Sequence, residues 1–157
     1  AVQWLKIDCT PLPFEHQTLD IVFTATVLQH NTDEAMLKKI LAEICRVSKD
    51  KVVLFERVEP EILGDKLCLG RPVDYYAAIC AEHGFELRET SFINVRVRYY
   101  MAGAIRKLLN PGKRVEGEPL NAPSLFLQRL LLPVTRMLDK VFVSKRDVTK
   151  MEFVRKN

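Results

Sequence analysis

The stretch Leu19-Asp-Ile-Val-Phe-Thr-Ala-Thr-Val-Leu-Gln-His30 decides the fold of this chain of 157 residues. Its first five residues, Leu19–Phe23, have the β-branched and aromatic character of a strand, and the turn after them ends in His30. Apolar residues then recur at helical spacing over Glu34–Val47, which predicts an amphipathic helix. Val52–Phe55 follows as a second apolar strand, so the order is strand, helix, strand.

The segments on either side continue this alternation. Before the stretch, Val2–Asp8 is predicted to be a strand that ends in an acid. After the turn, Asp33 or Thr32 can cap the predicted helix. Further along, a helix over Val73–Glu82 is expected to stop at His83-Gly84, where glycine suits a left-handed cap.

The rest of the chain adds one long strand, two helices and one short strand. In chain order they are predicted over Phe85–Val97, Ala102–Leu109, Leu125–Phe142 and Met151–Val154. Alternating strands and helices with short links indicate an α/β layered sheet. The continuous apolar run Val52–Phe55 predicts that both faces of this sheet are covered.

Composition is that of a folded protein, with 48% hydrophobic and 28% charged residues. No apolar run reaches the ~18 residues that a spanning helix needs, and the first residues lack the features of a signal peptide. The four cysteines form no C-x-x-C pair, so we expect no metal site, and scattered single cysteines favour a reducing, cytoplasmic location.

Charge is divided unevenly along the chain. Residues 1–95 hold 10 Lys and Arg against 15 Asp and Glu, whereas residues 96–157 hold 14 against 5. The basic segment is compatible with an acidic partner, a phosphate-bearing substrate, an anionic membrane surface or a plain solvated surface. Nucleic acid is not expected as a partner, because the segment lacks interleaved aromatics and any known binding module.

The order and spacing of short motifs resemble the second half of a class I S-adenosylmethionine-dependent methyltransferase, type 11-like, from its third strand onward. The family's motifs correspond here to Asp8, Leu12-Pro13-Phe14, Leu19-Asp20, Val27-Leu28-x-His30 and Glu43-x-x-Arg46-Val47. The resemblance implies a partial Rossmann-like sheet with a helical insert before the last, antiparallel strand. It divides the chain into an α/β core, residues 1–99 with 148–157, and an insert, residues 100–147.

The same resemblance implies S-adenosylmethionine as the cofactor. It implies that Asp8 accepts a hydrogen bond from the adenine amino group, that the Cys9 amide donates to the ring, and that Ala25 and Thr26 line the methionine end. Ligands of open α/β sheets bind beyond the carboxyl ends of the strands, where Asp8 is expected. The alternative for Asp8 is a turn acid that bonds its own backbone.

His30 is the candidate for catalysis. It is expected just beyond the carboxyl end of a strand, and an imidazole with an ordinary pKa of about 6.5 suits a general base. A structural or binding role for His30 stays open, because a methyl group on a sulfonium transfers largely through alignment. Glu56, Arg57 and Tyr75 are the candidate contacts of the methyl acceptor.

Other charged motif residues are assigned structural roles. Asp20 is predicted at the start of its strand, away from the ligand edge. Glu43 and Arg46 are spaced i,i+3 on one helix and are predicted to form a surface ion pair.

The family's glycine-rich first loop has no counterpart among these residues, since the sequence contains no G-x-G. We therefore expect a truncated chain that carries half of the cofactor site. On its own, such a chain is expected to be inactive unless its cofactor pocket is completed. Val2–Asp8 would then lack its neighbouring strand. An unpaired strand tends to pair with another copy, so a homo-oligomer that completes the sheet is expected.

Residues 100–147 have three open interpretations: a substrate lid, a dimer surface, or a basic amphipathic helix on an anionic membrane. Pro133 is predicted to interrupt the second helix, which disfavours the membrane and leaves the lid as the preferred interpretation.

The function predicted for the parent protein is methyl transfer from S-adenosylmethionine to a small-molecule or glycan/lipid-type acceptor. The alternative is a non-catalytic interaction or dimerisation module that retains part of a methyltransferase fold.

Overall fold

The computed structural model describes residues 4–7, 10–110, 112 and 119–156. It divides into two units. The first, here called the sheet unit, comprises residues 1–93 and 145–157, and the second, the hairpin unit, comprises residues 94–144.

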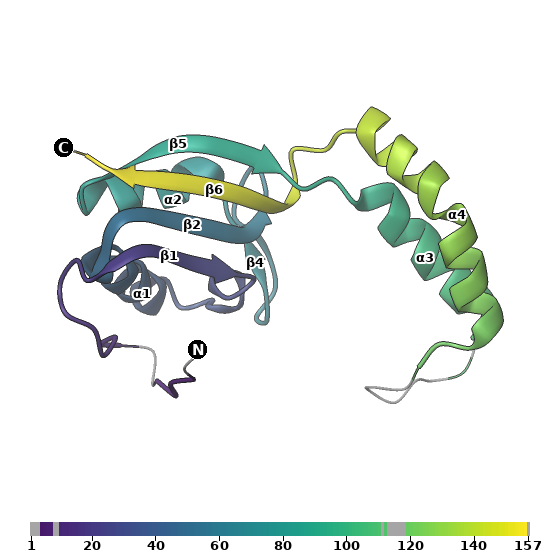
Figure 1. The fold of residues 1–157 in the computed structure, drawn as a ribbon, viewed down its shortest axis with the longest axis horizontal. Coiled ribbons are helices and arrows are strands. Elements are labelled where there is room, and N and C mark those ends of the chain that lie inside the picture. The colour runs from purple at the N-terminus through teal and green to yellow at the C-terminus, as the bar shows by residue number, and fades with distance from the viewer. Residues whose placement is uncertain (1–3, 8–9, 111, 113–118, 157) are drawn as a thin grey trace. The chain divides into compact units, whose positions relative to one another are not determined.

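The sheet unit is built on a four-stranded mixed sheet (Figure 1). Its order is β1 (Leu19–Ala25), β2 (Ser48–Val58), β6 (Asp147–Arg155) and β5 (Phe85–Phe92). β1 and β2 are parallel, whereas β6 runs antiparallel to both β2 and β5. The last strand of the chain is therefore inserted between two earlier ones.

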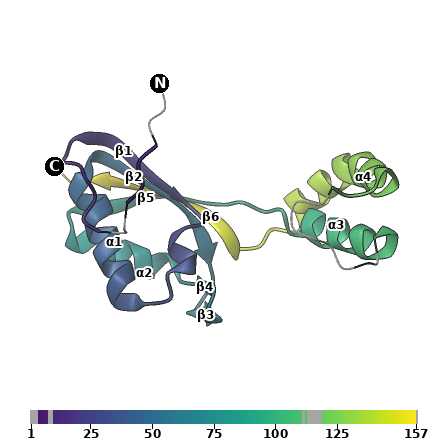
Figure 2. The same ribbon diagram turned by 90° about the horizontal axis from the view of Figure 1, so that it is seen from below.

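Helices α1 (Glu34–Val47) and α2 (Val73–Glu82) cover one face of this sheet (Figure 2). Burial in β2 alternates along the strand, because successive side chains point to opposite faces. Leu54 is fully buried among the core residues of α1 and α2, while its neighbours Val53 and Phe55 are only half-buried. Within the sheet unit, helices cover the face that carries Leu54, and the opposite face of β2 is half-buried.

Local signals position the helices as the sequence predicts. Asp33 caps α1, since its side chain accepts from the amides of Ala35 at 2.9 Å and Met36 at 3.3 Å. Gly84 follows α2 with a φ of 81°, a left-handed conformation that glycine adopts without a steric penalty. The bounds Glu34–Val47 and Val73–Glu82 are both confirmed.

Two short segments lie between these elements. The 3-10 helix η1 (Leu28–His30) follows β1, and a small hairpin of β3 (Leu63–Gly64) and β4 (Leu69–Gly70) follows β2. An isolated bridge joins Val58 to Arg71, so the end of this hairpin lies beside the end of β2.

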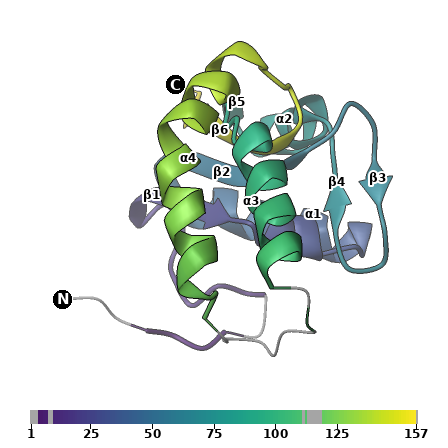
Figure 3. The ribbon, with the colours of Figure 1, turned by 90° about the vertical axis from the view of Figure 1, so that its right-hand side faces the viewer.

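The hairpin unit consists of α3 (Arg96–Leu109) and α4 (Ala122–Val141), which run side by side (Figure 3). α4 is continuous through Pro133, so the predicted interruption at this residue is wrong. No helix among the described residues combines the length and apolar character that crossing a membrane requires.

Two strand predictions need correction. Residues 4–7, the described part of the predicted strand Val2–Asp8, are not in a strand, and Trp4 is 92% exposed. Leu5 and Ile7 are also exposed, at 58% and 44%, and no described strand pairs with this segment. The predicted strand Phe85–Val97 ends at Phe92, and α3 begins at Arg96, because the apolar alternation that suggested a strand also fits the first turn of a helix.

Candidate functional site

The carboxyl ends of the parallel strands β1 and β2 lie side by side, with Ala25 paired to Phe55. Thr26 follows with a φ of 55°, and its amide donates to the Phe55 carbonyl at 2.7 Å. Ala25 and Thr26 are both exposed. In open α/β sheets ligands bind beyond the carboxyl ends of the strands, and these two residues lie at that edge.

Glu56 lies at the end of β2 and is fully buried behind this edge. One carboxylate oxygen accepts from the Thr24 hydroxyl at 2.8 Å and from the Val27 amide at 3.1 Å. The other accepts from the Gln29 amide at 3.1 Å. A buried carboxylate is stable only when it is hydrogen-bonded, and here the partners belong to β1 and the turn after it. Glu56 therefore fixes the shape of that turn.

Gln29 and His30 extend this network outward. The Arg57 amide donates to the side-chain oxygen of Gln29 at 2.9 Å, which leaves the Gln29 amino group to donate to His30 Nε2 at 3.2 Å. His30 Nδ1 lies 2.8 Å from the Leu67 carbonyl, which can only accept. The network thus assigns the neutral tautomer of His30 with its proton on Nδ1. His30 itself is exposed.

Arg57 follows Glu56 and points to the other face of the strand. Its guanidinium donates to Glu59 at 2.9 Å and lies 3.9 Å from the Cys68 sulfur. The hydrogen bond to Glu59 comes first among the causes that raise the pKa of Arg57. The side chain is about one-third exposed, so it remains accessible at the edge of the β3–β4 hairpin.

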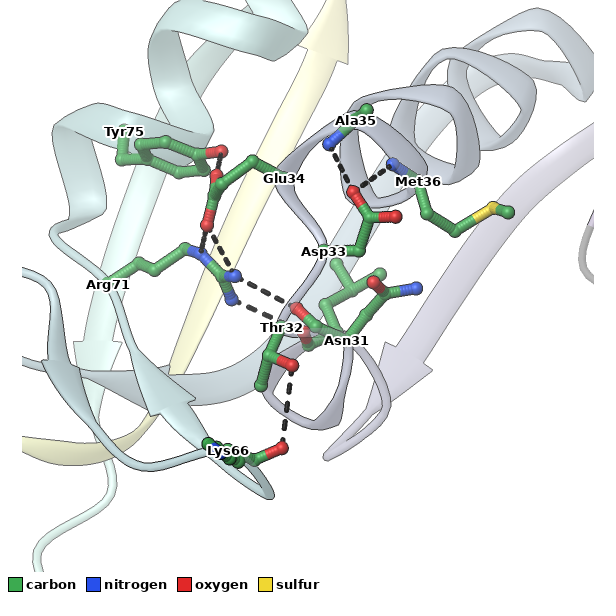
Figure 4. A network of polar contacts seen from close by, with 10 residues as sticks. Asn31, Thr32, Asp33, Glu34, Ala35, Met36, Lys66, Arg71 and Tyr75 are labelled. Carbon is green, nitrogen blue, oxygen red and sulfur yellow. Dashed lines mark hydrogen bonds and ion pairs between the residues drawn. The ribbon is translucent and has the colours of Figure 1, made fainter.

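A buried arginine joins the β3–β4 hairpin to the start of α1 (Figure 4). The Arg71 side chain is fully buried and donates to Glu34 Oε1 at 2.7 and 3.0 Å. It also donates to the Asn31 carbonyl at 2.9 Å and to the Leu28 carbonyl at 3.4 Å. The hydroxyl of Tyr75 donates to the second oxygen of Glu34. This cluster anchors the segment that carries His30.

The cluster changes the proton affinities of its members. Burial raises the pKa of Tyr75 to about 12, with a further contribution from the Glu34 carboxylate. Burial also acts to raise the pKa of Glu34, but the hydrogen bonds from Tyr75 and Arg71 outweigh it, and the pKa lies below its ordinary value. Glu34 thus stays ionised and keeps both partners in place.

Glu43 and Arg46 form the ion pair that their spacing predicts, with Nε and Oε1 2.8 Å apart. The pair also holds an earlier segment of the chain. Glu43 accepts from the Leu12 amide at 2.8 Å, and Arg46 donates to the carbonyls of Leu12 at 3.1 Å and Phe14 at 2.9 Å. The Leu-Pro-Phe and E-x-x-R motifs are therefore one structural unit.

The predicted site residues divide into three groups. Ala25, Thr26, His30 and Glu56 lie together at the carboxyl edge, with Glu56 buried behind the others. Arg57 and Tyr75 lie beside them and are engaged in ion pairs and hydrogen bonds within the protein. Asp8 and Cys9, the predicted adenine contacts, lie outside the described residues.

Sequence reasoning missed four residues of this edge: Thr24, Gln29, Glu34 and Arg71. One signal was available, since Glu56 is two residues after Leu54 and shares its inward face. This alternation along the strand predicts that Glu56 is buried. A buried carboxylate requires hydrogen-bond donors such as Thr24 nearby. Arg71 and Glu34 are 37 residues apart in sequence, and no local pattern connects them.

A family model described as a methyltransferase domain matches residues 1–55. No curated protein matches the chain. Among solved structures, the [4+2]-cyclase SpnF has a TM-score of 0.57 at 16% identity, over 96% of this chain and 55% of that one. This chain thus spans about half the length of SpnF.

Two further structures are methyltransferases by name. A protein of Galdieria sulphuraria assigned as a sarcosine dimethylglycine methyltransferase has a TM-score of 0.54 at 16% identity, over 91% of this chain and 55% of that one. The phosphoethanolamine N-methyltransferase 2 of Haemonchus contortus, with bound S-adenosylhomocysteine, has a TM-score of 0.50 at 14% identity, over 91% of this chain and 35% of that one. The chain therefore has a fold similar to part of the class I methyltransferase fold of these structures.

Proposed function

We propose that this chain carries part of the cofactor and acceptor site of an enzyme that transfers a methyl group from S-adenosylmethionine to a small-molecule or glycan/lipid-type acceptor. The observation that carries the proposal is the carboxyl edge of β1 and β2, where Ala25 and Thr26 are exposed and the buried Glu56 holds the flanking Thr24 hydroxyl and Val27 amide. A sheet of this fold binds ligands at that edge.

The residues at the edge are compatible with this cofactor. Ala25 and Thr26 would line its methionine end, and the resemblance adds Asp8 and Cys9 at the adenine. The cofactor supplies a methyl group on a positively charged sulfur, which is already activated for transfer. The protein then has to align the acceptor in line with that methyl group and exclude water.

Glu56 and Arg71 act as positioning residues in this proposal. Glu56 holds the turn after β1, and Arg71 holds the segment from Leu28 to Glu34, so that His30 is presented from a fixed backbone. His30 can take a proton from an acceptor through Nε2 once the Gln29 amide moves aside. Arg57 and Tyr75 remain proposed acceptor contacts.

A non-catalytic interaction module is the second candidate. β1 is an edge strand of the described sheet, and its Ile21 and Phe23 side chains are 58% and 67% exposed. An exposed apolar edge strand readily pairs with another chain, including a second copy of this one.

Calorimetric titration with S-adenosylhomocysteine separates the two candidates. Binding heat from the unchanged chain, lost in Ala25→Tyr and retained in Ala35→Tyr, supports the methyltransferase site. Ala35 is a matched control because it is an exposed alanine on α1. Absence of heat from the unchanged chain, together with a concentration-dependent dimer, supports the interaction module.

A further inference from the structure

The α4 helix exposes many of its apolar residues, which is unusual for a surface helix. Its three buried residues, Ser124, Thr135 and Asp139, are all polar. A surface helix usually buries its apolar stripe and exposes its polar side chains. Leu131, Leu132 and Leu138 are half-buried, but other apolar residues of α4 are exposed and are not explained by packing within the hairpin.

Polar contacts at both ends of α4 fasten it to the rest of the hairpin unit. Asp139 accepts from the Val97 amide at 2.8 Å, and Asn94 donates to the Phe142 carbonyl at 2.7 Å. At the other end, Asn121 donates to the Leu109 carbonyl at 2.7 Å. The face of α4 that lies toward α3 is thereby fixed, and the opposite face is directed away from α3.

That outward face is a continuous apolar stripe. Its members, spaced three or four residues apart, are Phe126 (68% exposed), Leu130 (60%), Val134 (47%), Met137 (61%) and Val141 (68%). Helical spacing places them on one side of α4. Isolated exposed apolar residues need no explanation, but a stripe of five along a whole helix indicates a binding surface.

Cations accompany the stripe. Arg129, Arg136 and Lys140 are exposed and are spaced seven and four residues apart along α4, so they lie together on one flank of the stripe. The described residues of the hairpin unit include seven Lys and Arg but a single acid, the buried Asp139. The accessible charge of this unit is therefore positive.

A groove between α3 and α4 carries a second, related feature. It has a volume of about 210 Å³ and apolar walls that include Met101, Ile105, Leu125 and Leu132. Arg98 and Arg129 also line it. Guanidinium groups beside an apolar groove match a molecule that joins hydrocarbon to an anionic headgroup.

We propose that the hairpin unit docks on the surface of an anionic phospholipid bilayer, with α4 lying in the interface plane. The apolar stripe enters the boundary between headgroups and acyl chains, and Arg129, Arg136 and Lys140 reach lipid phosphates. Positive charge favours this partner over a neutral membrane. The inference is independent of methyl transfer, because it depends on the hairpin unit alone.

The test is co-sedimentation of the full 157-residue chain with two kinds of vesicle. One contains phosphatidylcholine alone, and the other contains equal parts of phosphatidylcholine and phosphatidylglycerol. Binding is expected to the anionic vesicles and to decrease as salt is added, since salt screens the charges. Absence of binding to the anionic vesicles, or equal binding to both kinds, overturns the proposal.

Three variants sharpen the result. The charge variant R129Q/R136Q/K140Q is expected to bind anionic vesicles at least about tenfold more weakly, since each cation near the surface contributes. The control K38Q/K39Q/K49Q removes the same charge from exposed positions of the sheet unit and is expected to bind like the unchanged chain. Equal weakening by both variants contradicts a specific surface.

The apolar variant F126Q/L130Q/M137Q changes only exposed side chains, so the hairpin is expected to fold. It is expected to lose vesicle binding and to leave the sedimentation coefficient in lipid-free buffer unchanged. If it instead abolishes a dimer of the unchanged chain, a second copy covers the stripe and the lipid proposal is wrong.

Discussion

The carboxylate of Glu56 on β2 accepts a hydrogen bond from the hydroxyl of Thr24 on β1 at 2.8 Å. The same carboxylate accepts from the amides of Val27 and Gln29 in the turn that follows β1. One buried acid therefore joins two parallel strands to the turn at their carboxyl ends. The stability of the sheet unit and the shape of the proposed ligand edge depend on the same group.

Glu56→Gln is expected to lower the free energy of unfolding by about 2 kcal/mol, because an amide cannot accept from every donor and leaves a buried N–H unpaired. Urea denaturation monitors the change. Glu86→Gln is the control, since Glu86 is exposed on β5, and it is expected to be neutral. A Glu56→Gln chain as stable as the control would show that these hydrogen bonds contribute little.

Arg71→Met is expected to lower the free energy of unfolding by about 3 kcal/mol, since it removes the arginine donors of Glu34 Oε1 and of the Asn31 carbonyl. Arg71→Lys should recover little of this loss, because one ammonium group cannot reproduce the arrangement of guanidinium donors. Hydrogen exchange of residues 28–34 should become faster in both variants. Unchanged exchange there would contradict the anchoring role, and Arg88→Met at an exposed position is the control.

The Glu43–Arg46 pair predicts a pH dependence of stability. The hydrogen bond from Arg46 holds the pKa of Glu43 below its ordinary value of 4.5. The unfolded chain therefore binds the proton more readily than the folded chain. The stabilisation from the Glu43–Arg46 pair is fully present above the ordinary pKa of Glu43. It is lost as the pH falls through the lower pKa that Glu43 has in the folded chain.

Glu43→Gln tests this dependence. The unchanged chain should lose more stability than the variant between neutral pH and acid, by about 1 kcal/mol. Denaturation curves across this range measure the difference, and Glu61→Gln, at an exposed position, should follow the unchanged chain. Parallel curves for all three chains would show that Glu43 does not contribute.

The network around His30 predicts its tautomer. Because the Arg57 amide fixes the orientation of the Gln29 side chain, His30 Nε2 accepts and Nδ1 carries the proton. Nitrogen-15 NMR at a pH of about 8, where an ordinary imidazole is neutral, should show a protonated Nδ1. Gln29→Leu should weaken this preference. A dominant Nε2–H tautomer in the unchanged chain would contradict the network.

Local signals in the sequence were sufficient for much of the fold. The Asp33 cap and the left-handed Gly84 delimit α1 and α2, because both depend on residues within one turn of the helix end. The parallel pair β1 and β2 follows from apolar runs on either side of α1. The wrong strand prediction at residues 4–7 has a non-local cause. An apolar run becomes a strand only when a neighbouring strand pairs with it, and the run itself does not show whether that neighbour is present.

The site was less predictable than the fold. His30, Ala25 and Thr26 could be placed at the carboxyl edge because they directly follow a strand. The Glu34, Arg71 and Tyr75 cluster could not be predicted, because its members come from three separate elements that meet only in the folded chain. Pro133 indicated a helix break, but packing and polar contacts with α3 keep α4 continuous.

Binding of the cofactor at the carboxyl edge is tested most directly by NMR of the nitrogen-15-labelled chain titrated with S-adenosylhomocysteine. If Ala25 and Thr26 line the methionine end, the largest amide shifts fall on residues 25–30, and Ala25→Tyr suppresses them. This readout detects even weak binding by a chain that spans about half of SpnF. Saturating ligand that leaves residues 25–30 unshifted, or that shifts only residues elsewhere, would contradict the cofactor site.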